Sequence, residues 1–197
     1  MPITPIGVVM HSEYPMLDGN QVKLVPLSKE HSSELWDSVG NNPEVWKWLR
    51  LPTVPNSQVE IDLLVQKAIN ERDRGERLPF VVVNQSGQVV GSVSLLGFNQ
   101  ESERVEIGWV FFAQKFWGRG YASKALKLLV HYAIQELNAY RIQLTVMEGN
   151  DSSERMVLKL GFKKEGILEA YLKKVDGTRC DVGLYRILKP EWHPNEM

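Results

Sequence analysis

Two glycines two positions apart, Gly118 and Gly120, lie where a strand-like segment meets a helix-like one. The segment Glu103–Phe112 is rich in Val, Ile, Trp and Phe, as strands are. After the glycines, apolar residues recur through Leu137 at spacings of three and four, as in helices. A first helical turn offers free backbone N–H groups and a favourable dipole, and glycine lets an anion come close. The junction therefore predicts a phosphate-binding site.

Three kinds of phosphate ligand compete for this junction. The chain has no G-x-x-x-x-G-K-[ST] string, so a Walker A loop is excluded. A dinucleotide fingerprint would need a third glycine where Ser123 stands, and an acidic residue about 20 positions on, where Tyr140 and Arg141 occur. The third candidate is the pyrophosphate of coenzyme A.

Composition bounds the class of protein. The 197 residues are 43% hydrophobic and 24% charged with a net charge of −1, which predicts one soluble domain over residues 1–197 with an N-terminal arm over 1–19. Neutral charge gives no basic footprint for nucleic acid, and no run of about 20 apolar residues predicts a membrane span. A single cysteine, Cys180, and the absence of a signal-like start favour the cytoplasm. The four histidines have no metal-ligand spacing, so we expect no metal.

The remaining pattern predicts a mixed sheet flanked by helices. Strands are expected at 21–26, 79–83, 88–97, 103–112, 140–147, 162–172 and 179–188. Helices are expected at 29–39, at EVWKWL after Pro43, at 57–74, at the segment after Gly120, and at 152–160. Asn84–Gly87 and Asp176-Gly177 are expected to turn two antiparallel hairpins.

The motifs in this order resemble the GNAT N-acetyltransferase superfamily, and more narrowly its RimJ/RimL-type branch. The resemblance rests on EIGWVF followed by QKFWGRGYASKAL and NDSSERMVLKLGF, and it extends from VKLVPLSKEHSSELW to TRCDVGLYRILKPEW. The family loop is [RQ]-x-x-G-x-[GA]. Aligning its glycines places Lys115 at the Arg/Gln position, a mild departure because backbone amides matter more there.

The resemblance implies a GNAT fold of the α+β (α/β) type. Its mixed, mostly antiparallel sheet would have about seven strands, and its central parallel strands would splay apart beside a bulge. Acetyl-CoA would be the co-substrate, with the pantetheine arm in the splay and the pyrophosphate on amides of the loop. The implied cofactor-binding residues are Trp109, Val110, Phe111, Trp117, Gly118, Arg119, Gly120, Tyr121, Ala122 and Asn150.

Two residues are candidates for catalysis. An ammonium group must lose a proton before it can attack a thioester, and Glu106 is a carboxylate between apolar Val105 and Ile107. Partial burial would raise its pKa toward a useful range, although it could equally be solvated or paired with an arginine. By resemblance, Ser153 would donate to the leaving thiolate; alternatively, Ser152 or Ser153 only caps a helix.

The acceptor pocket is expected to combine aromatic and acidic side chains, which would attract a cationic amine. Its candidates are Trp46, Trp48, Tyr171, Asp181 and Tyr185, of which the last two share a strand face because they are four residues apart. Core packing of the aromatic residues is the alternative.

The predicted function is transfer of an acetyl group from acetyl-CoA to a primary amine by direct attack in a ternary complex. The amine could belong to a protein N-terminus or a small molecule, and the protein could be a monomer or a homodimer. Two alternatives stay open: a non-catalytic sensor of CoA or acyl-CoA, and a dinucleotide-binding oxidoreductase. Turnover in the wild type and its loss in Glu106→Gln would separate an enzyme from a sensor.

Overall fold

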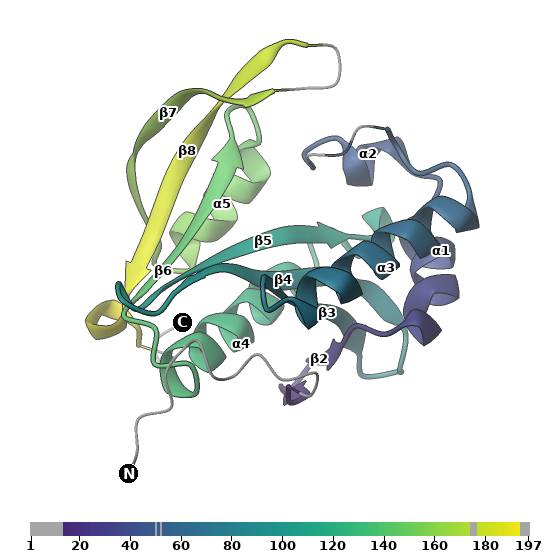
Figure 1. The fold of residues 1–197 in the computed structure, drawn as a ribbon, viewed down its shortest axis with the longest axis horizontal. Helices are drawn as coiled ribbons and strands as arrows, with labels where there is room; N and C mark the ends of the chain where they lie inside the picture. The colour runs from purple at the N-terminus through teal and green to yellow at the C-terminus, as the bar shows by residue number, and fades with distance from the viewer. Residues whose placement is uncertain (1–13, 50, 52, 174–176, 194–197) are drawn as a thin grey trace.

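The computed structural model describes residues 14–49, 51, 53–173 and 177–193. Its strands form one sheet in the order β1-β2-β3-β4-β5-β6-β8-β7 (Figure 1). The strands are β1 (Leu17–Asp18), β2 (Val22–Pro26), β3 (Arg77–Asn84), β4 (Val89–Asn99), β5 (Arg104–Phe112), β6 (Arg141–Met147), β7 (Lys163–Lys173) and β8 (Arg179–Leu188). The α-helices are α1 (Ser32–Val39), α2 (Pro43–Trp46), α3 (Gln58–Asp73), α4 (Tyr121–Gln135) and α5 (Asp151–Lys159). Short 3-10 turns are η1 (Lys29–His31), η2 (Gln114–Phe116) and η3 (Lys189–Glu191).

The sheet is mixed, as the sequence predicts. All neighbouring strands run antiparallel except β5 and β6, which are parallel and are joined through α4. The strand that was not predicted is the two-residue β1. It lies inside the segment 1–19 that was assigned to the N-terminal arm, and it pairs with β2. Residues 1–13 of that arm lie outside the described residues.

Helices cover both faces of the strands (Figure 1). On one face α1 and α3 bury apolar residues at helical spacing, such as Leu35 and Val39 on α1 and Ile61 and Val65 on α3. On the other face α4 buries Ala125, Leu126, Leu129 and Ala133, and its Tyr132 ring meets Phe80 of β3 edge to face. The core therefore holds α4 firmly against the strands that lead to the glycine loop.

Several boundaries differ from the sequence-based expectation. The first helix begins with η1, and α2 ends at Trp46 rather than continuing through the EVWKWL segment. Asn84 closes the β3–β4 turn, since its side chain accepts hydrogen bonds from the amides of Ser86 and Gln88. The expected Asp176-Gly177 turn falls partly outside the described residues. Among the described helices, none combines the length and apolar character that a bilayer crossing requires.

Candidate active site

β5 and β6 pair over a short stretch and then part. Their register runs from Arg104 opposite Arg141 to Glu106 opposite Gln143, although β5 continues for six more residues and β6 for four. Beyond this point, which we call the fork, the backbone N–H and C=O groups on the facing edges of β5 and β6 do not pair with each other. The predicted separation of the two central parallel strands is therefore present, and Glu106 lies at its closed end.

A bulge accompanies the fork. Between the pair Ser94–Gly108 and the pair Ser92–Phe111, β5 has two residues where β4 has one. Trp109, in the bulge, has a left-handed backbone conformation with φ of 52°, which is strained for an L-residue. Its ring lies under the guanidinium of Arg77, 4.5 Å from the ring centroid, so a buried cation supports the bulge.

Arg77 is itself fixed on three sides. Its side chain is 6% exposed, donates to the hydroxyl of Ser94 at 2.8 Å and pairs with Glu71 of α3 at 3.1 Å. Burial lowers the pKa of Arg77, and the Glu71 carboxylate acts against that shift. The bulge of β5 is thus clamped between β3, β4 and α3.

A cleft with two connected parts fills the fork. The inner part, about 430 Å³, is lined by Glu106, Trp109 and Tyr171 among others, and the outer part, about 360 Å³, by the glycine loop and the start of α4. Both volumes fall in the range typical of small-molecule sites. Six residues line both parts: Trp48, Leu49, Val110, Asn150, Ser153 and Met156. One cleft therefore leads from the loop to the Glu106 carboxylate.

The loop at the outer end presents backbone amides. Gly118 and Gly120 have φ of 72° and 79°, which L-residues rarely adopt, and Gly120 is the N-cap of α4. No side chain caps this helix, so its first amides point into the cleft without a protein acceptor in the described structure. Trp117 fastens the loop to the end of β5 by donating from Nε1 to the carbonyl of Phe112 at 2.7 Å.

The amide cradle is narrower than the predicted residue set. The amides of Trp117 and Arg119 already donate to the carbonyls of Gln114 and Phe116, and the Arg119 side chain is exposed and does not line the cleft. Gly118, Gly120, Tyr121 and Ala122 do line it. The structure therefore brings the glycines and the first turn of α4 together but leaves Arg119 outside.

Glu106 and Gln143 meet at the closed end of the cleft. The Glu106 side chain is half-buried, and its Oε2 accepts a hydrogen bond from Gln143 Nε2 at 3.4 Å. Arg104 and Arg141, proposed as pairing partners, do not contact it; Arg141 instead pairs with Glu165. The other carboxylate oxygen, Oε1, accepts no hydrogen bond in the described structure, and the side chain lines the cleft.

Asn150 and Ser153 stand where the two parts of the cleft join. Asn150 is the N-cap of α5, and its Oδ1 accepts from the Ser153 amide at 3.3 Å. The expectation that Ser152 or Ser153 caps this helix is therefore wrong. In the described structure no protein group hydrogen-bonds the Ser153 hydroxyl, which is left available to the cleft.

Trp46 does not belong to the acceptor pocket. It is 3% exposed, its Nε1 donates to the carbonyls of Val39 and Gly40, and its ring packs on Phe111 at 4.9 Å. Trp48, two residues further and beyond the end of α2, does line the cleft. The alternative of core packing is therefore correct for Trp46. The ring of Trp48 instead lies near Gly149, across the cleft from α2.

Tyr185 and Asp181 have structural roles instead. Tyr185 is 1% exposed, and its hydroxyl donates to Glu154 Oε1 at 2.5 Å beneath α5. Burial and this carboxylate raise the pKa of Tyr185 to about 12. Asp181 accepts from the Ala170 amide at 2.7 Å, holding a left-handed residue with φ of 49° in β7. The adjacent Tyr171 lines the cleft as predicted.

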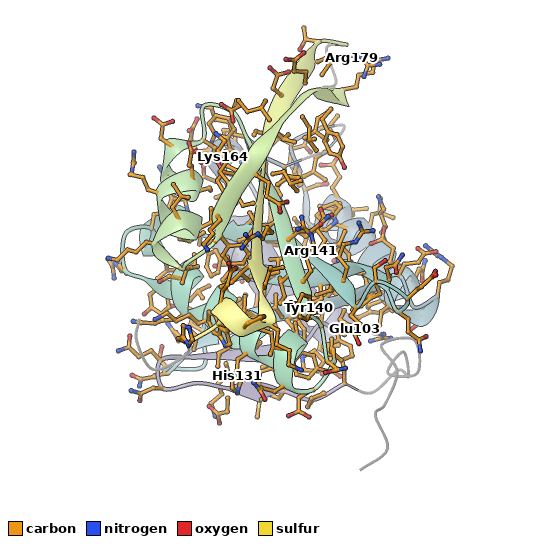
Figure 2. The ribbon with its side chains drawn as sticks, turned by 90° about the vertical axis from the view of Figure 1, so that its left-hand side faces the viewer. Glu103, His131, Tyr140, Arg141, Lys164 and Arg179 are labelled. Carbon is orange, nitrogen blue, oxygen red and sulfur yellow. The ribbon has the colours of Figure 1, made fainter. Side chains whose placement is uncertain are left out.

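A hydrogen-bonded cluster ties α5 to the last hairpin. Lys164 of β7 lies beside α5 (Figure 2) and reaches Glu148 at 3.2 Å and Glu154 at 3.1 Å. The hydrogen bonds from Tyr185 and Lys164 lower the pKa of Glu154. Because Glu154 follows Ser153 directly, this cluster fixes the first turn of α5 and the cleft groups on it.

Many residues of the cleft lining were not anticipated, among them Met156, Thr145 and Lys67. Met156 lies one helical turn after Ser153, so the three-residue spacing could have indicated it. Thr145 lies on β6 beyond the fork. Lys67 comes from α3, and no local pattern links it to β5; only the packing of α3 brings it there. In the described part of the chain, no group of three His, Cys, Asp or Glu residues could hold a metal ion.

A mixed sheet that opens beside a bulge, with uncapped helix amides at the mouth of the opening, is the arrangement that the resemblance to GNAT N-acetyltransferases predicts. The model of the acetyltransferase (GNAT) domain family matches residues 21–163, and the chain belongs to this family. It is an acetyl-CoA-dependent N-acetyltransferase. This family assignment decides against the sensor and the oxidoreductase.

Characterised and solved relatives agree. The spermidine N(1)-acetyltransferase of Escherichia coli (strain K12) is 32% identical over 154 residues, 78% of each chain. A GCN5-related N-acetyltransferase from Brucella melitensis has 27% identity and a TM-score of 0.83, over 91% of this chain and 81% of that one. RimL, a ribosomal L7/L12 α-N-protein acetyltransferase solved with coenzyme A, shares the fold at 22% identity and a TM-score of 0.76, over 88% and 98%. The predicted membership of the GNAT superfamily is confirmed, and RimL/RimJ-type proteins are among the chain's sequence and structural neighbours.

Proposed function

We propose that the protein acetylates a primary amine by direct attack within a ternary complex. Glu106 takes a proton from the bound ammonium, directly or through one water, and the free amine attacks the thioester carbonyl. The carbon–sulfur bond then breaks. The acetylated nitrogen gives up its extra proton, and the Ser153 hydroxyl donates its own proton to the departing thiolate and is reprotonated from that nitrogen, directly or through water. The observation that supports this order is the single cleft joining the glycine loop, Ser153 and Glu106.

The same cleft suits acetyl-CoA. Free amides at Gly118, Gly120 and the start of α4 match a diphosphate, because a helix N-terminus binds anions. The unpaired edges of β5 and β6 match the amide groups of a pantetheine arm. Asn150 adds its side-chain Nδ2 donors to these contacts, since its Oδ1 accepts from the Ser153 amide of α5.

The charges in the inner part of the cleft favour an acceptor with one cationic centre. Among the described residues that line it, Glu106 is the sole carboxylate, and the one lysine, Lys67, pairs with Glu71 of α3 at 3.8 Å. A polyamine would bring several positive charges to a site with a single carboxylate. Trp48, Tyr171 and Leu172 supply aromatic and apolar walls. We therefore expect a monoamine or the α-amino group of a peptide, in contrast to the spermidine of the E. coli relative.

A panel of amines tests both parts. The purified protein is mixed with acetyl-CoA and either spermidine, a monoamine or short peptides with free N-termini, and released thiol is measured. We expect a higher kcat/KM for the monoamine or a peptide than for spermidine. No thiol release with any amine, together with no thermal stabilisation by acetyl-CoA, would contradict the transferase proposal. Spermidine as the best substrate would contradict only the acceptor argument.

A further inference from the structure

A chain of side-chain hydrogen bonds runs from Glu106 to the last hairpin. Gln143 Nε2 donates to Glu106 Oε2 at 3.4 Å, and Arg141 Nε donates to Gln143 Oε1 at 3.1 Å. The two Nη groups of Arg141 then pair with the two carboxylate oxygens of Glu165 at 2.9 and 2.5 Å. The chain therefore links β5, β6 and β7, and neither Gln143 nor Arg141 lines the active-site cleft.

The strands set these side chains in one row. Glu106 and Gln143 are direct partners where β5 and β6 are paired, and Arg141 lies two residues before Gln143 on the same face of β6. The backbone amide of Arg141 donates to the carbonyl of Glu103 at 3.1 Å, so the beginning of β6 is held as well. The backbone thus places Arg141 beside Gln143, and Gln143 beside Glu106.

The amide of Gln143 has one orientation that satisfies both neighbours. A guanidinium carries only donors, and an ionised carboxylate carries only acceptors. A half-turn of the amide would place Nε2 against the N–H of Arg141 and Oε1 against the oxygen of Glu106, which would break both hydrogen bonds. Arg141 therefore selects the orientation in which Gln143 donates to the carboxylate.

Glu165 fixes Arg141 from the other side. A guanidinium and a carboxylate that share two parallel hydrogen bonds are held in one geometry. Glu165 lies where the register of β7 against β8 shifts, and its Oε1 is also 3.4 Å from Arg186 Nε of β8. Because both Nη groups of Arg141 serve Glu165, its Nε–H is the group that remains for Gln143.

We propose that Gln143 and Arg141 are positioning residues for Glu106, an inference that rests on the proposed role of this carboxylate as the base. Gln143 holds Oε2, and Arg141 holds the amide in the orientation that does so. Oε1 then takes the proton that the ammonium loses. Since a base acts only within hydrogen-bond reach of its proton, a carboxylate that rotates freely would be a slower base.

Two single variants and their combination test this role, with the amine that reacts fastest in the panel. Gln143→Met removes the donor at similar size, and kcat should fall about tenfold while the KM for acetyl-CoA stays within about twofold. Arg141→Met should lower kcat about fivefold, because the amide can then turn away from Glu106. The double variant should be no slower than Gln143→Met, since Arg141 acts through Gln143. Reductions that multiply in the double variant would overturn the proposal.

Gln143→Glu separates positioning from a structural role. The new side chain still accepts from Arg141, but it presents an acceptor to Glu106 in place of a donor. We expect kcat to fall at least about tenfold in protein that thermal unfolding shows to be folded. Wild-type kcat in this variant would overturn the proposal, and if Arg141→Met does not fold, Gln143→Glu carries the test.

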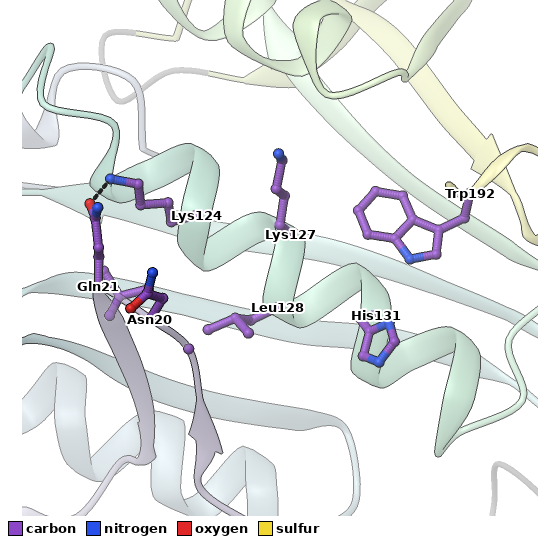
Figure 3. A pocket seen from close by; sticks show the side chains of 9 residues that line it. Asn20, Gln21, Lys124, Lys127, Leu128, His131 and Trp192 are labelled. Atoms are coloured by element: carbon purple, nitrogen blue, oxygen red, sulfur yellow. Dashed lines mark hydrogen bonds between the residues drawn. The ribbon is translucent and has the colours of Figure 1, made fainter. Parts of the chain in front are cut away.

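Gln21→Met is the matched control. Gln21 Oε1 also accepts from a cation, the ammonium of Lys124 on α4, but it does so in the turn before β2 and outside the cleft lining (Figure 3). We expect wild-type kcat in this control. Turnover that is retained in Glu106→Gln would refute the base and the positioning together. Turnover that is lost in Glu106→Gln but unchanged in both Gln143 variants would refute the positioning alone.

Discussion

The two ends of β5 behave differently toward β6. From Arg104 to Glu106 the strands are hydrogen-bonded in register, whereas from Ile107 onward they diverge although both remain strands. Strand propensity alone does not predict where the pairing stops, since β-branched residues, Val105 and Ile107, stand on both sides of Glu106. The difference coincides with one inserted residue at Trp109 and a buried arginine beneath it. A small irregularity supported by the core thus turns a sheet interior into a binding cleft.

Each end also carries its own chemistry. The paired end presents a carboxylate at a fixed position, because Glu106 is held by neighbours on both sides. The parted end presents unpaired backbone groups and leads to the amides of the loop. We infer that proton transfer belongs to the first and co-substrate binding to the second, and variants at each end should affect different measurements.

The largest effect is expected at the paired end, from Glu106→Gln. The substitution keeps the shape and the contact with Gln143 but removes the base, so kcat should fall at least about a hundredfold. The dissociation constant of acetyl-CoA, measured by calorimetry, should stay within about twofold of the wild-type value, because the glycine loop is untouched. Glu101→Gln in an exposed turn is the control. Unchanged turnover in Glu106→Gln would remove this residue from the mechanism.

The next effect concerns the clamp under the bulge. Arg77→Met breaks the buried pair with Glu71 and the stack on Trp109, and should lower the free energy of unfolding by about 3 kcal/mol. Chemical denaturation measures this loss. Arg74→Met is the matched control, since it breaks an exposed pair with Glu76 and should cost little. Equal losses in the two variants would mean that the bulge has no buried support.

Sequence reasoning located these two ends for different reasons. A strand-like composition predicted the strand around Glu106, helical periodicity predicted α4, and the bounds of β8 agree with the predicted 179–188. The glycine spacing predicted the loop because positive φ values are a local property. Composition and periodicity therefore predicted the strands and helices, and a motif predicted the glycine loop at the parted end.

The acceptor side was harder to predict because its residues are selected by packing. Trp46 and Trp48 look alike in sequence, but only the position of Val39, Gly40 and Phe111 in space makes the first a core residue. Tyr185 and Asp181 share a strand face, yet Glu154 and Lys164 cover that face at Tyr185 and leave it open at Asp181. No local sequence pattern indicates which residues of a strand a distant helix will cover, so these positions could not be predicted from the sequence.

At the parted end, Gly120→Ala should weaken acetyl-CoA binding about tenfold. A side chain at φ of 79° costs about 1–2 kcal/mol, and relief of that strain would reorient the first amides of α4. Gly87→Ala is a close control, because φ there is 80° in the β3–β4 turn and the position lies in open space. The two variants should lose similar stability by thermal unfolding, but only Gly120→Ala should bind acetyl-CoA more weakly in calorimetry.

Ser153 lies on α5 where the inner and outer parts of the cleft join, and Ser153→Ala distinguishes a proton donor from a structural serine. Since Asn150 and not Ser153 caps α5, the melting temperature should hardly change. Loss of a hydrogen bond to the leaving thiolate should lower kcat about tenfold, with little change in acetyl-CoA affinity. Steady-state kinetics and thermal unfolding together check this. Wild-type kcat in Ser153→Ala would show that another group serves the thiolate.

The smallest effect is expected where α5 is anchored, and it depends on pH. The Tyr185 and Lys164 hydrogen bonds hold the pKa of Glu154 below its ordinary value of 4.5. A depressed carboxyl pKa stabilises the fold above the ordinary value, and this contribution is lost as the pH falls through the depressed one. Glu154→Gln should therefore melt at a slightly lower temperature than the wild type at pH 7, and the difference should shrink as the pH falls below 4.5. Glu169→Gln on the exposed side of β7 is the control, and a gap that persists at low pH would assign the loss to packing rather than to charge.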